Sequence, residues 1–146
     1  MTTLIRMEFV VDASVEAAWG HLARVADWPS WAKHIKCVDL DPPGEITADS
    51  TGVIHLRFGP ASAFRMVEFD PPRNWKWVGR FLWLTVHYDH IFEPHGERTK
   101  LTWIVSCEGF GAAVIGRLFA LIYNRNLNKA IPNLIAEMEE HTGAQI

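Results

Sequence analysis

The sequence predicts an α+β domain in which an antiparallel sheet of seven strands packs against one long C-terminal helix. Three observations support this class: segments of alternating apolar and polar residues, short turn-rich connections between most of them, and helical periodicity at the end of the chain. The chain has 146 residues, of which 49% are hydrophobic, and a net charge of −3. A chain of this size has enough apolar side chains for its own core, so we expect a single domain spanning residues 1–146.

The first segments predict a strand followed by two short helices. Residues 3–11 alternate apolar and polar side chains, as a half-buried strand does. Asp12 and Ser14 both have side chains that cap helices, so a helix is expected over residues 15–25. A proline then interrupts the helical pattern, and we expect a second helix of one to two turns over residues 30–35.

Six further strands are expected before residue 109. Clusters of Pro, Gly, Asp and Asn separate the alternating segments, and the connections are short. Short connections between successive strands are typical of an antiparallel meander. The predicted strands are residues 36–41, 52–58, 61–69, 74–83, 84–93 and 98–108.

Helical periodicity then extends from residue 112 to residue 141. Pro132 is expected to kink this helix, because proline removes one backbone hydrogen bond. An apolar stripe along the helix predicts that it lies on one face of the sheet. The stripe consists of Ala113, Ala120, Tyr123, Leu127, Ala130, Ile131, Leu134 and Met138.

Strand periodicity predicts which sheet residues meet this helix. In residues 84–92 the even positions are mostly apolar and the odd positions mostly polar, so the even side chains face the interior. The same test assigns to the interior Trp75, Trp77, Gly79, Phe81, Trp83, Leu84, Val86, Tyr88, His90, Phe92, Leu101, Trp103, Val105 and Cys107. On the two less regular strands we expect Leu56, Phe58, Phe64 and Met66 to face inward.

Several short motifs, in this order and spacing, resemble the SRPBCC superfamily, which joins the START lipid-transfer domains, the birch-pollen-allergen-like proteins and the bacterial polyketide cyclase/dehydratase proteins. The likeness covers roughly residues 3–141. It implies a helix-grip fold, in which a seven-stranded sheet wraps around the C-terminal helix and encloses a cavity for a hydrophobic ligand. The superfamily includes carriers, hormone receptors, cyclases and chaperone-binding modules, so the likeness implies no single chemistry. The motifs are Ala18-Trp19-x-x-Leu22, Asp27-Trp28-Pro29-x-Trp31, Asp70-Pro71-Pro72-Arg73, His90-Ile91-Phe92-Glu93-Pro94 with Gly96, Thr99-x-Leu101-Thr102-Trp103 and Glu108-Gly109.

The aromatic content is unusually high, with seven Trp, eight Phe and two Tyr. Such large side chains either fill a core or form the wall of a cavity, and in a helix-grip fold the two roles partly coincide. The candidate ligand-binding residues are Trp77, Phe81, Tyr88, His90, Phe92, Trp103, Val105, Phe119, Tyr123 and Leu127.

Tyr88 and His90 are polar residues on an otherwise apolar face. They are satisfied core residues, or they orient a polar group of the ligand, or, in an enzyme, they act as the acid and base of a ring closure. Asn126 and Asn133 on the long helix are the other polar candidates for the inner face, but they flank the apolar stripe, at positions where surface residues are more common.

Charge and composition exclude several classes. No basic stripe is present for nucleic acid, and no apolar run is long enough for stable membrane insertion. Glu8 and Asp12 stand where a signal peptide would need its apolar centre, so a cytoplasmic location is expected. Cys37 and Cys107 are expected to be free thiols.

We expect neither a metal nor a cofactor. His87 and His90 are three residues apart on a strand and therefore point to opposite faces. The other histidines considered, His21, His34, His95 and His141, are expected on the surface without carboxylates around them. Sequence motifs for a nucleophile elbow or a phosphate-binding loop are absent as well.

The sequence thus favours a carrier or sensor of a small hydrophobic molecule, lipid-like or aromatic and polyketide-like, as a monomer or homodimer. The alternative is a cyclase/dehydratase that uses His90 and Tyr88. A second alternative is a protein-interaction module with an exposed apolar surface.

Overall fold

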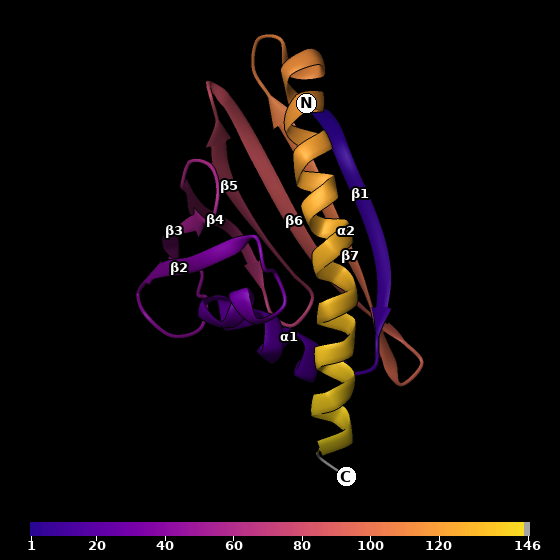
Figure 1. Cartoon of the computed structure of the whole chain (residues 1–146). Helices are drawn as coiled ribbons and strands as arrows, with labels where there is room; N and C mark the ends of the chain where they lie inside the picture. The colour runs from indigo at the N-terminus through magenta and orange to yellow at the C-terminus, as the bar shows by residue number, and fades with distance from the viewer. Residues whose placement is uncertain (145–146) are drawn as a thin grey trace.

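The computed structural model describes residues 1–144, with side chains to residue 139 (Figure 1). His141 therefore lies outside the residues whose side chains are described. The elements in chain order are β1 (Thr2–Val11), α1 (Val15–Ala23), the 3₁₀ helix η1 (Val25–Ser30), β2 (Ile35–Asp41), β3 (Thr51–Leu56), β4 (Ser62–Asp70), β5 (Asn74–Phe81), β6 (Leu84–His95), β7 (Arg98–Glu108) and α2 (Ala112–Ala144).

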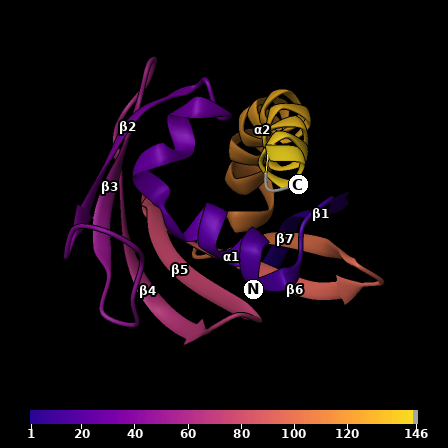
Figure 2. The same cartoon turned by 90° about the horizontal axis from the view of Figure 1, so that it is seen from below.

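The strands form one antiparallel sheet in the order β1-β7-β6-β5-β4-β3-β2. Successive strands from β2 to β7 are neighbours, and β1 closes the far edge by pairing with β7. The sheet curves around α2, with α1 and η1 lying at one end of the same concave face (Figures 1 and 2). The structure is a helix-grip fold, as predicted.

The first helix begins as expected and the second does not. The Oγ of Ser14 accepts a hydrogen bond of 3.2 Å from the backbone N–H of Ala17 and caps α1. The second helix spans Val25–Ser30, so the prediction of a helix over residues 30–35 is wrong. The Nε1 of Trp28 donates to the carbonyl of Leu22 at 2.9 Å. Because this bond and the burial of the indole fix the chain directly after α1, the short helix forms before Ser30.

The interior face of the sheet follows the predicted alternation in most strands. Two of the expected inward residues are exposed instead: Phe58, at 92%, and Trp83, at 56%. Both stand beyond the ends of paired strands, since β3 ends at Leu56 and Trp83 belongs to the turn between β5 and β6. A turn does not maintain the alternation of a strand, which explains both errors.

The apolar stripe of α2 packs on the sheet through Leu127, Ala130, Leu134 and Met138, all buried. At its start the helix is rotated by one residue from the expected position, so Ala112 is buried and Ala113 is exposed. Here Gly116 lies close to the sheet: a Cβ at this position would be 2.7 Å from the Sγ of Cys107. The helix α2 continues through Pro132.

Candidate ligand-binding cavity

A cavity of about 330 Å³ lies between the sheet and the first half of α2. Its wall comes from η1 and the segment after it, from β2 to β7, and from one face of α2. Nine of the ten residues that the sequence predicts for ligand binding line it: Trp77, Phe81, Tyr88, His90, Trp103, Val105, Phe119, Tyr123 and Leu127. The aromatic side chains therefore form both the core and a cavity wall.

Phe92 is not part of this wall. It shares the inward face of β6 with His90 but lies nearer to α1, which covers that end of the sheet. Its ring packs against Trp19 and Trp75, with centroids 5.1 and 5.5 Å away. In this structure Phe92 is thus a core residue adjacent to the cavity.

Sequence reasoning missed a part of the wall. Trp28 and Trp31 from η1 and its C-cap, Ile54 and Leu56 from β3, and Asn126 from α2 all line the cavity. Trp28 and Trp31 are three residues apart with Pro29 between them, and their ring centroids lie 5.4 Å from one another. That motif was part of the family likeness, but only the tertiary structure brings it against β5, where Trp28 packs on Trp77 at 5.4 Å.

His90 is surrounded by aromatic rings. Its imidazole stacks on Trp75 at a centroid distance of 4.5 Å and lies 5.2 Å from Trp77 and 5.9 Å from Trp103. Burial in these apolar surroundings lowers the pKa of His90 to about 3, and a backbone hydrogen bond to Trp75 opposes this only partly. His90 is therefore a neutral imidazole at physiological pH.

Two ring nitrogens of cavity residues have no hydrogen-bond partner among the described residues. They are the Nδ1 of His90 and the Nε1 of Trp103, both buried. An indole N–H is a donor only, whereas a neutral imidazole nitrogen donates or accepts according to its tautomer. Buried polar groups in proteins are nearly always hydrogen-bonded, so each of these two nitrogens has an unused capacity to form a hydrogen bond.

The rings of Tyr88 and Tyr123 are neighbours in the cavity wall, with centroids 5.7 Å apart. Burial raises the pKa of Tyr88 well above its ordinary value, and the neighbouring Tyr123 adds to this. Burial likewise raises the pKa of Tyr123 well above its ordinary value. Both phenols are therefore neutral hydroxyl groups at physiological pH, available as hydrogen-bond donors and acceptors.

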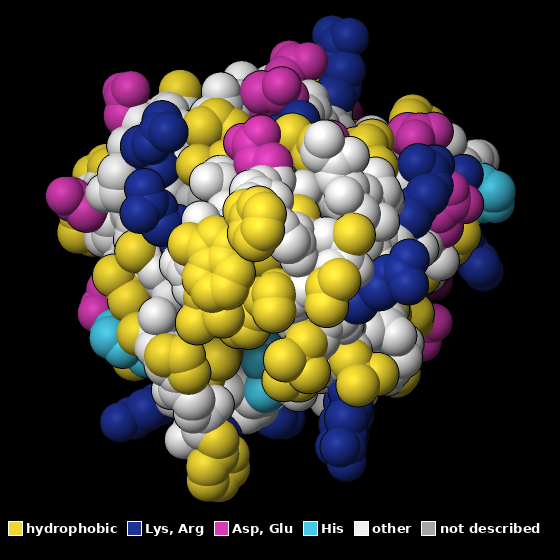
Figure 3. Space-filling model, turned by 90° about the horizontal axis from the view of Figure 1, so that it is seen from above, with side chains coloured by type: hydrophobic (Ala, Val, Ile, Leu, Met, Phe, Trp, Pro, Cys, Tyr) yellow, Lys and Arg dark blue, Asp and Glu magenta, His cyan; other side chains and the backbone are white. Residues whose placement is uncertain are grey.

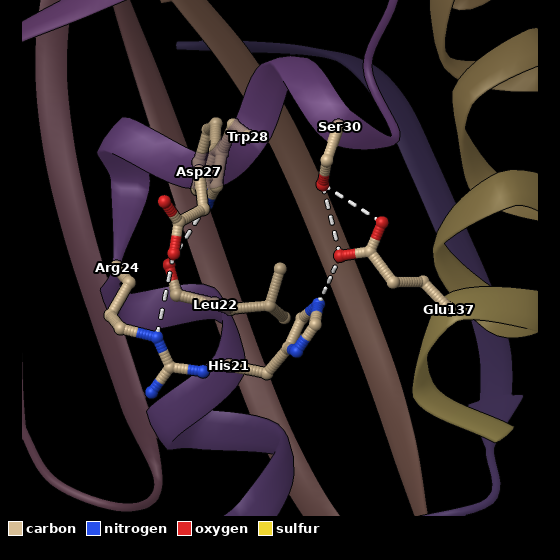
Figure 4. Close-up of polar contacts among 7 residues, drawn as sticks. All are labelled: His21, Leu22, Arg24, Asp27, Trp28, Ser30 and Glu137. Atoms are coloured by element: carbon tan, nitrogen blue, oxygen red, sulfur yellow. Dashed lines mark hydrogen bonds and ion pairs between the residues drawn. The ribbon is translucent and has the colours of Figure 1, made fainter. Parts of the chain in front are cut away.

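A cluster of polar groups ties the second half of α2 to α1 and η1 (Figure 4). Glu137 lies 2.7 Å from the Nε2 of His21 and accepts hydrogen bonds of 3.0 and 2.8 Å from the Oγ of Ser30. The expectation that His21 is a surface residue without a carboxylate is therefore wrong. The pairing joins residues 116 positions apart, so no local pattern predicts it. Asn133 adds a hydrogen bond of 3.2 Å to the carbonyl of Trp31.

One group of side chains has the ligand types of a metal site. Cys37 and Asp39 of β2 and His55 of β3 place one ligand atom each within 4.8 Å of one another, and the Nε2 of His55 lies 2.8 Å from Asp39. His55 alternates with Ile54 and Leu56, which line the cavity, so this cluster is on the opposite face of the sheet.

The fold and cavity define the class of helix-grip proteins with an internal apolar pocket. The chain belongs to the family described as polyketide cyclase / dehydrase and lipid transport, whose model matches residues 2–139. This confirms the resemblance seen in the sequence motifs, and the family supports a ligand-binding or cyclase role. A comparison with curated protein sequences finds no match.

Solved structures of low sequence identity share the fold. A Thermobifida fusca protein solved by NMR has a TM-score of 0.75 at 14% identity, covering 96% of this chain and 95% of the other. The di-domain ARO/CYC StfQ from the steffimycin biosynthetic pathway has 0.73 at 14%, covering 97% and 53%. The major latex-like protein 151 of Panax ginseng has 0.70 at 15%, covering 92% and 95%.

Proposed function

We propose that this protein binds a small hydrophobic molecule in the cavity, as a carrier or sensor, and that the molecule has at least one oxygen that accepts a hydrogen bond. One observation carries the proposal: an aromatic-walled cavity whose lining residues include Trp103 and His90, each with a buried ring nitrogen that has no partner among the described residues. A carbonyl, ether or hydroxyl oxygen of the ligand would accept from the indole N–H and complete this hydrogen bonding.

The dimensions of the cavity agree with a small ligand. Pockets that bind small molecules usually have volumes of about 300 to 1,000 Å³ and apolar walls with a few polar groups. At about 330 Å³, this cavity is near the lower end of that range. We therefore expect a compact aromatic or polyketide-like compound, or a short lipid, rather than a long-chain diacyl lipid.

The electrostatics favour binding over acid–base chemistry at Tyr88 and His90. General acid–base catalysis is most efficient when the pKa of the catalytic group is close to the working pH. Burial moves both groups away from neutrality, the pKa of His90 down to about 3 and that of Tyr88 upward. We therefore infer that these side chains orient the ligand, and that a cyclase/dehydratase activity is the second candidate.

Native mass spectrometry of protein purified from its own host tests for a retained small molecule. Titration with an anilinonaphthalene dye, and displacement of the dye by aromatic or fatty compounds, provides a second test. We expect saturable binding at one site and a change in tryptophan fluorescence, because Trp77 and Trp103 line the cavity.

A pair of variants separates binding in the cavity from binding at the surface. Leu56→Trp replaces a half-buried leucine of the cavity wall with the larger indole side chain. This variant is expected to weaken dye binding at least about tenfold. Val67→Trp makes a similar enlargement at an exposed position of β4 outside the cavity wall and is the control. Absence of saturable binding, or equal binding by both variants, would falsify the cavity assignment.

A further inference from the structure

Three separate parts of the chain expose large apolar side chains at the same end of the molecule. Phe58 lies between β3 and β4, Leu82 and Trp83 form the turn between β5 and β6, and Phe110 directly precedes α2. Phe58 and Phe110 are 92% and 91% exposed. The Nε1 of Trp83 donates a hydrogen bond of 2.8 Å to the carbonyl of Phe110 and joins the turn to the start of the helix.

The first turns of α2 continue this exposed surface. Val114, Leu118 and Leu121 are exposed and follow Phe110 at intervals of three and four residues, so they lie on one side of the helix, away from the sheet. We call these seven side chains the apolar end. Figure 3, which views the molecule from above, shows hydrophobic side chains gathered in a patch at this end, with basic side chains on either side and acidic side chains above it in the view. Single exposed apolar residues are common, but a gathered set of this size usually indicates an interaction surface.

The apolar end borders the cavity. Phe58 is among the residues that line the cavity, and so is Ile122, which follows Leu121 on α2 and is also exposed. An apolar surface therefore extends from the outside of the molecule to the cavity wall. A hydrophobic ligand moving along it would remain in contact with apolar side chains instead of water.

The segments that form the apolar end have a positive net charge, whereas the whole chain has a negative net charge. These segments, residues 56–62, 80–85 and 108–126, contain Arg57, Arg80, Arg117 and Arg125 against a single acidic residue, Glu108. Glu108 lies 3.0 Å from the Nε2 of His87. The chain as a whole has a net charge of −3, so the positive charge is local to this end.

We propose that the apolar end docks reversibly on an anionic lipid surface, with its apolar side chains among the acyl chains and its arginines at the headgroups. This inference rests on the proposed function, because docking places the cavity entrance against the bilayer, from which a hydrophobic ligand is exchanged. Peripheral proteins bind anionic membranes by burying apolar side chains in the bilayer interface and by electrostatic attraction of basic residues to the lipid headgroups. Within the described residues no helix is long and apolar enough to cross a membrane, so the docking is peripheral.

Flotation with lipid vesicles tests the proposal. We expect the full-length protein to float with vesicles of phosphatidylcholine containing about one-third phosphatidylglycerol, and less with pure phosphatidylcholine. The double variant Phe110→Ser/Leu118→Ser is expected to lower the partition coefficient at least about tenfold, because both side chains are exposed and their loss leaves the core intact. Val67→Ser, which removes an exposed apolar side chain on β4, is the matched control and is expected to bind as the wild type.

The arginines are tested separately. Arg117→Gln/Arg125→Gln is expected to weaken binding to the anionic vesicles by roughly fivefold per arginine, and to reduce its dependence on salt. Dye binding in the cavity is measured on every variant and should remain as in the wild type, since none of the five substituted residues lines the cavity.

Two results would overturn the docking proposal while leaving the proposed function in place: intact dye binding without flotation at low salt, or equal flotation of the wild type and Phe110→Ser/Leu118→Ser. Self-association that Phe110→Ser/Leu118→Ser abolishes, together with no flotation, would assign the apolar end to a second copy of the chain and also overturn it. Absence of saturable dye binding by the wild type would instead contradict the proposed function.

Discussion

The imidazole of His90 lies nearly parallel to the indole of Trp75, with ring centroids 4.5 Å apart and an angle of 21° between the planes. The two residues are directly opposite one another on β5 and β6, so the register of the sheet produces the stack. Protonation of His90 would place a charge in this apolar layer without compensation by an acid, which is why its pKa is lowered to about 3.

This stack predicts that acid destabilises the protein through His90. In the unfolded chain a histidine has a pKa near its ordinary value of 6.5, so below that pH the unfolded state binds a proton that the folded state does not. The free energy of unfolding therefore falls as the pH is lowered. Its expected loss at His90 is about 1.4 kcal/mol between pH 7.5 and 5.5.

Denaturant unfolding at these two pH values gives the slope of the free energy of unfolding against pH. The difference in this slope between the wild type and His90→Gln measures the contribution of His90. His34 is half-buried and its pKa is also lowered by burial, so it adds to the slope in both proteins and cancels in the comparison. His95→Gln, at an exposed position, is the control and should keep the wild-type slope. The same pH dependence in wild type and His90→Gln would contradict the prediction.

Two helical glycines, Gly20 and Gly116, are predicted to respond oppositely to alanine. At Gly20 of α1 the nearest atom to an added Cβ is 3.9 Å away, so Gly20→Ala should stabilise the protein by roughly 0.5 to 1 kcal/mol through helix propensity. At Gly116 of α2 the added Cβ would stand 2.7 Å from Cys107 and 3.0 Å from Leu4. Overpacking of this kind typically costs about 1 to 3 kcal/mol.

Thermal unfolding of both variants, and of Gly116→Ala/Cys107→Ala, checks this relationship. The double variant shortens the side chain that the new methyl group meets and should recover part of the lost stability. An increase in melting temperature for Gly116→Ala alone would show that α2 does not approach the sheet so closely.

Much of this fold follows from local patterns. The period-two alternation of β5, β6 and β7 gave the inward residues correctly, because paired strands on a buried face keep strict alternation. The turns did not obey it: Phe58 and Trp83 lie where pairing has ended, and their exposure depends on loop geometry. Both residues belong to the apolar end.

The candidate site shows where local patterns stop being informative. Periodicity placed Tyr88 and His90 inside, but the lowered pKa of His90 depends on Trp75 and Trp77 of β5 and Trp103 of β7 packing around it. The contribution of Trp28 and Trp31 to the cavity wall requires η1 to fold back on β5, and Glu137 meets His21 only through tertiary packing. Cavity volume likewise depends on small packing differences that residue types alone do not determine.

Two leucines of α2 are predicted to differ although both are buried. Leu134 is 0% exposed and lies in the core, whereas Leu127 is 5% exposed and borders the cavity. Buried leucine-to-alanine substitutions cost about 2 to 5 kcal/mol, more where the surroundings are densely packed. We expect Leu134→Ala near the upper end of this range and Leu127→Ala near the lower end.

Chemical denaturation and dye titration on the same proteins test this difference. Only Leu127→Ala should alter dye affinity, and the exposed Lys129→Ala should change stability by less than about 0.5 kcal/mol. Equal costs for the two leucines would mean that the cavity is closed beside Leu127. No cost for either would mean that α2 does not pack on the sheet.

The last prediction separates a carrier from an enzyme at Tyr88 and His90, with the ligand recovered by mass spectrometry. If the two side chains orient the ligand, Tyr88→Phe and His90→Gln should each weaken binding by about 1 to 3 kcal/mol, and prolonged incubation should return the ligand unchanged. If they transfer protons, the same variants should lower a rate of product formation about 10²- to 10⁴-fold with little effect on binding. The pKa of about 3 for His90 favours the first outcome, because a base that weak accepts a proton poorly at neutral pH. Product formation by the wild type that both variants lose would establish the enzyme instead, and wild-type binding by both variants would show that neither residue contacts the ligand.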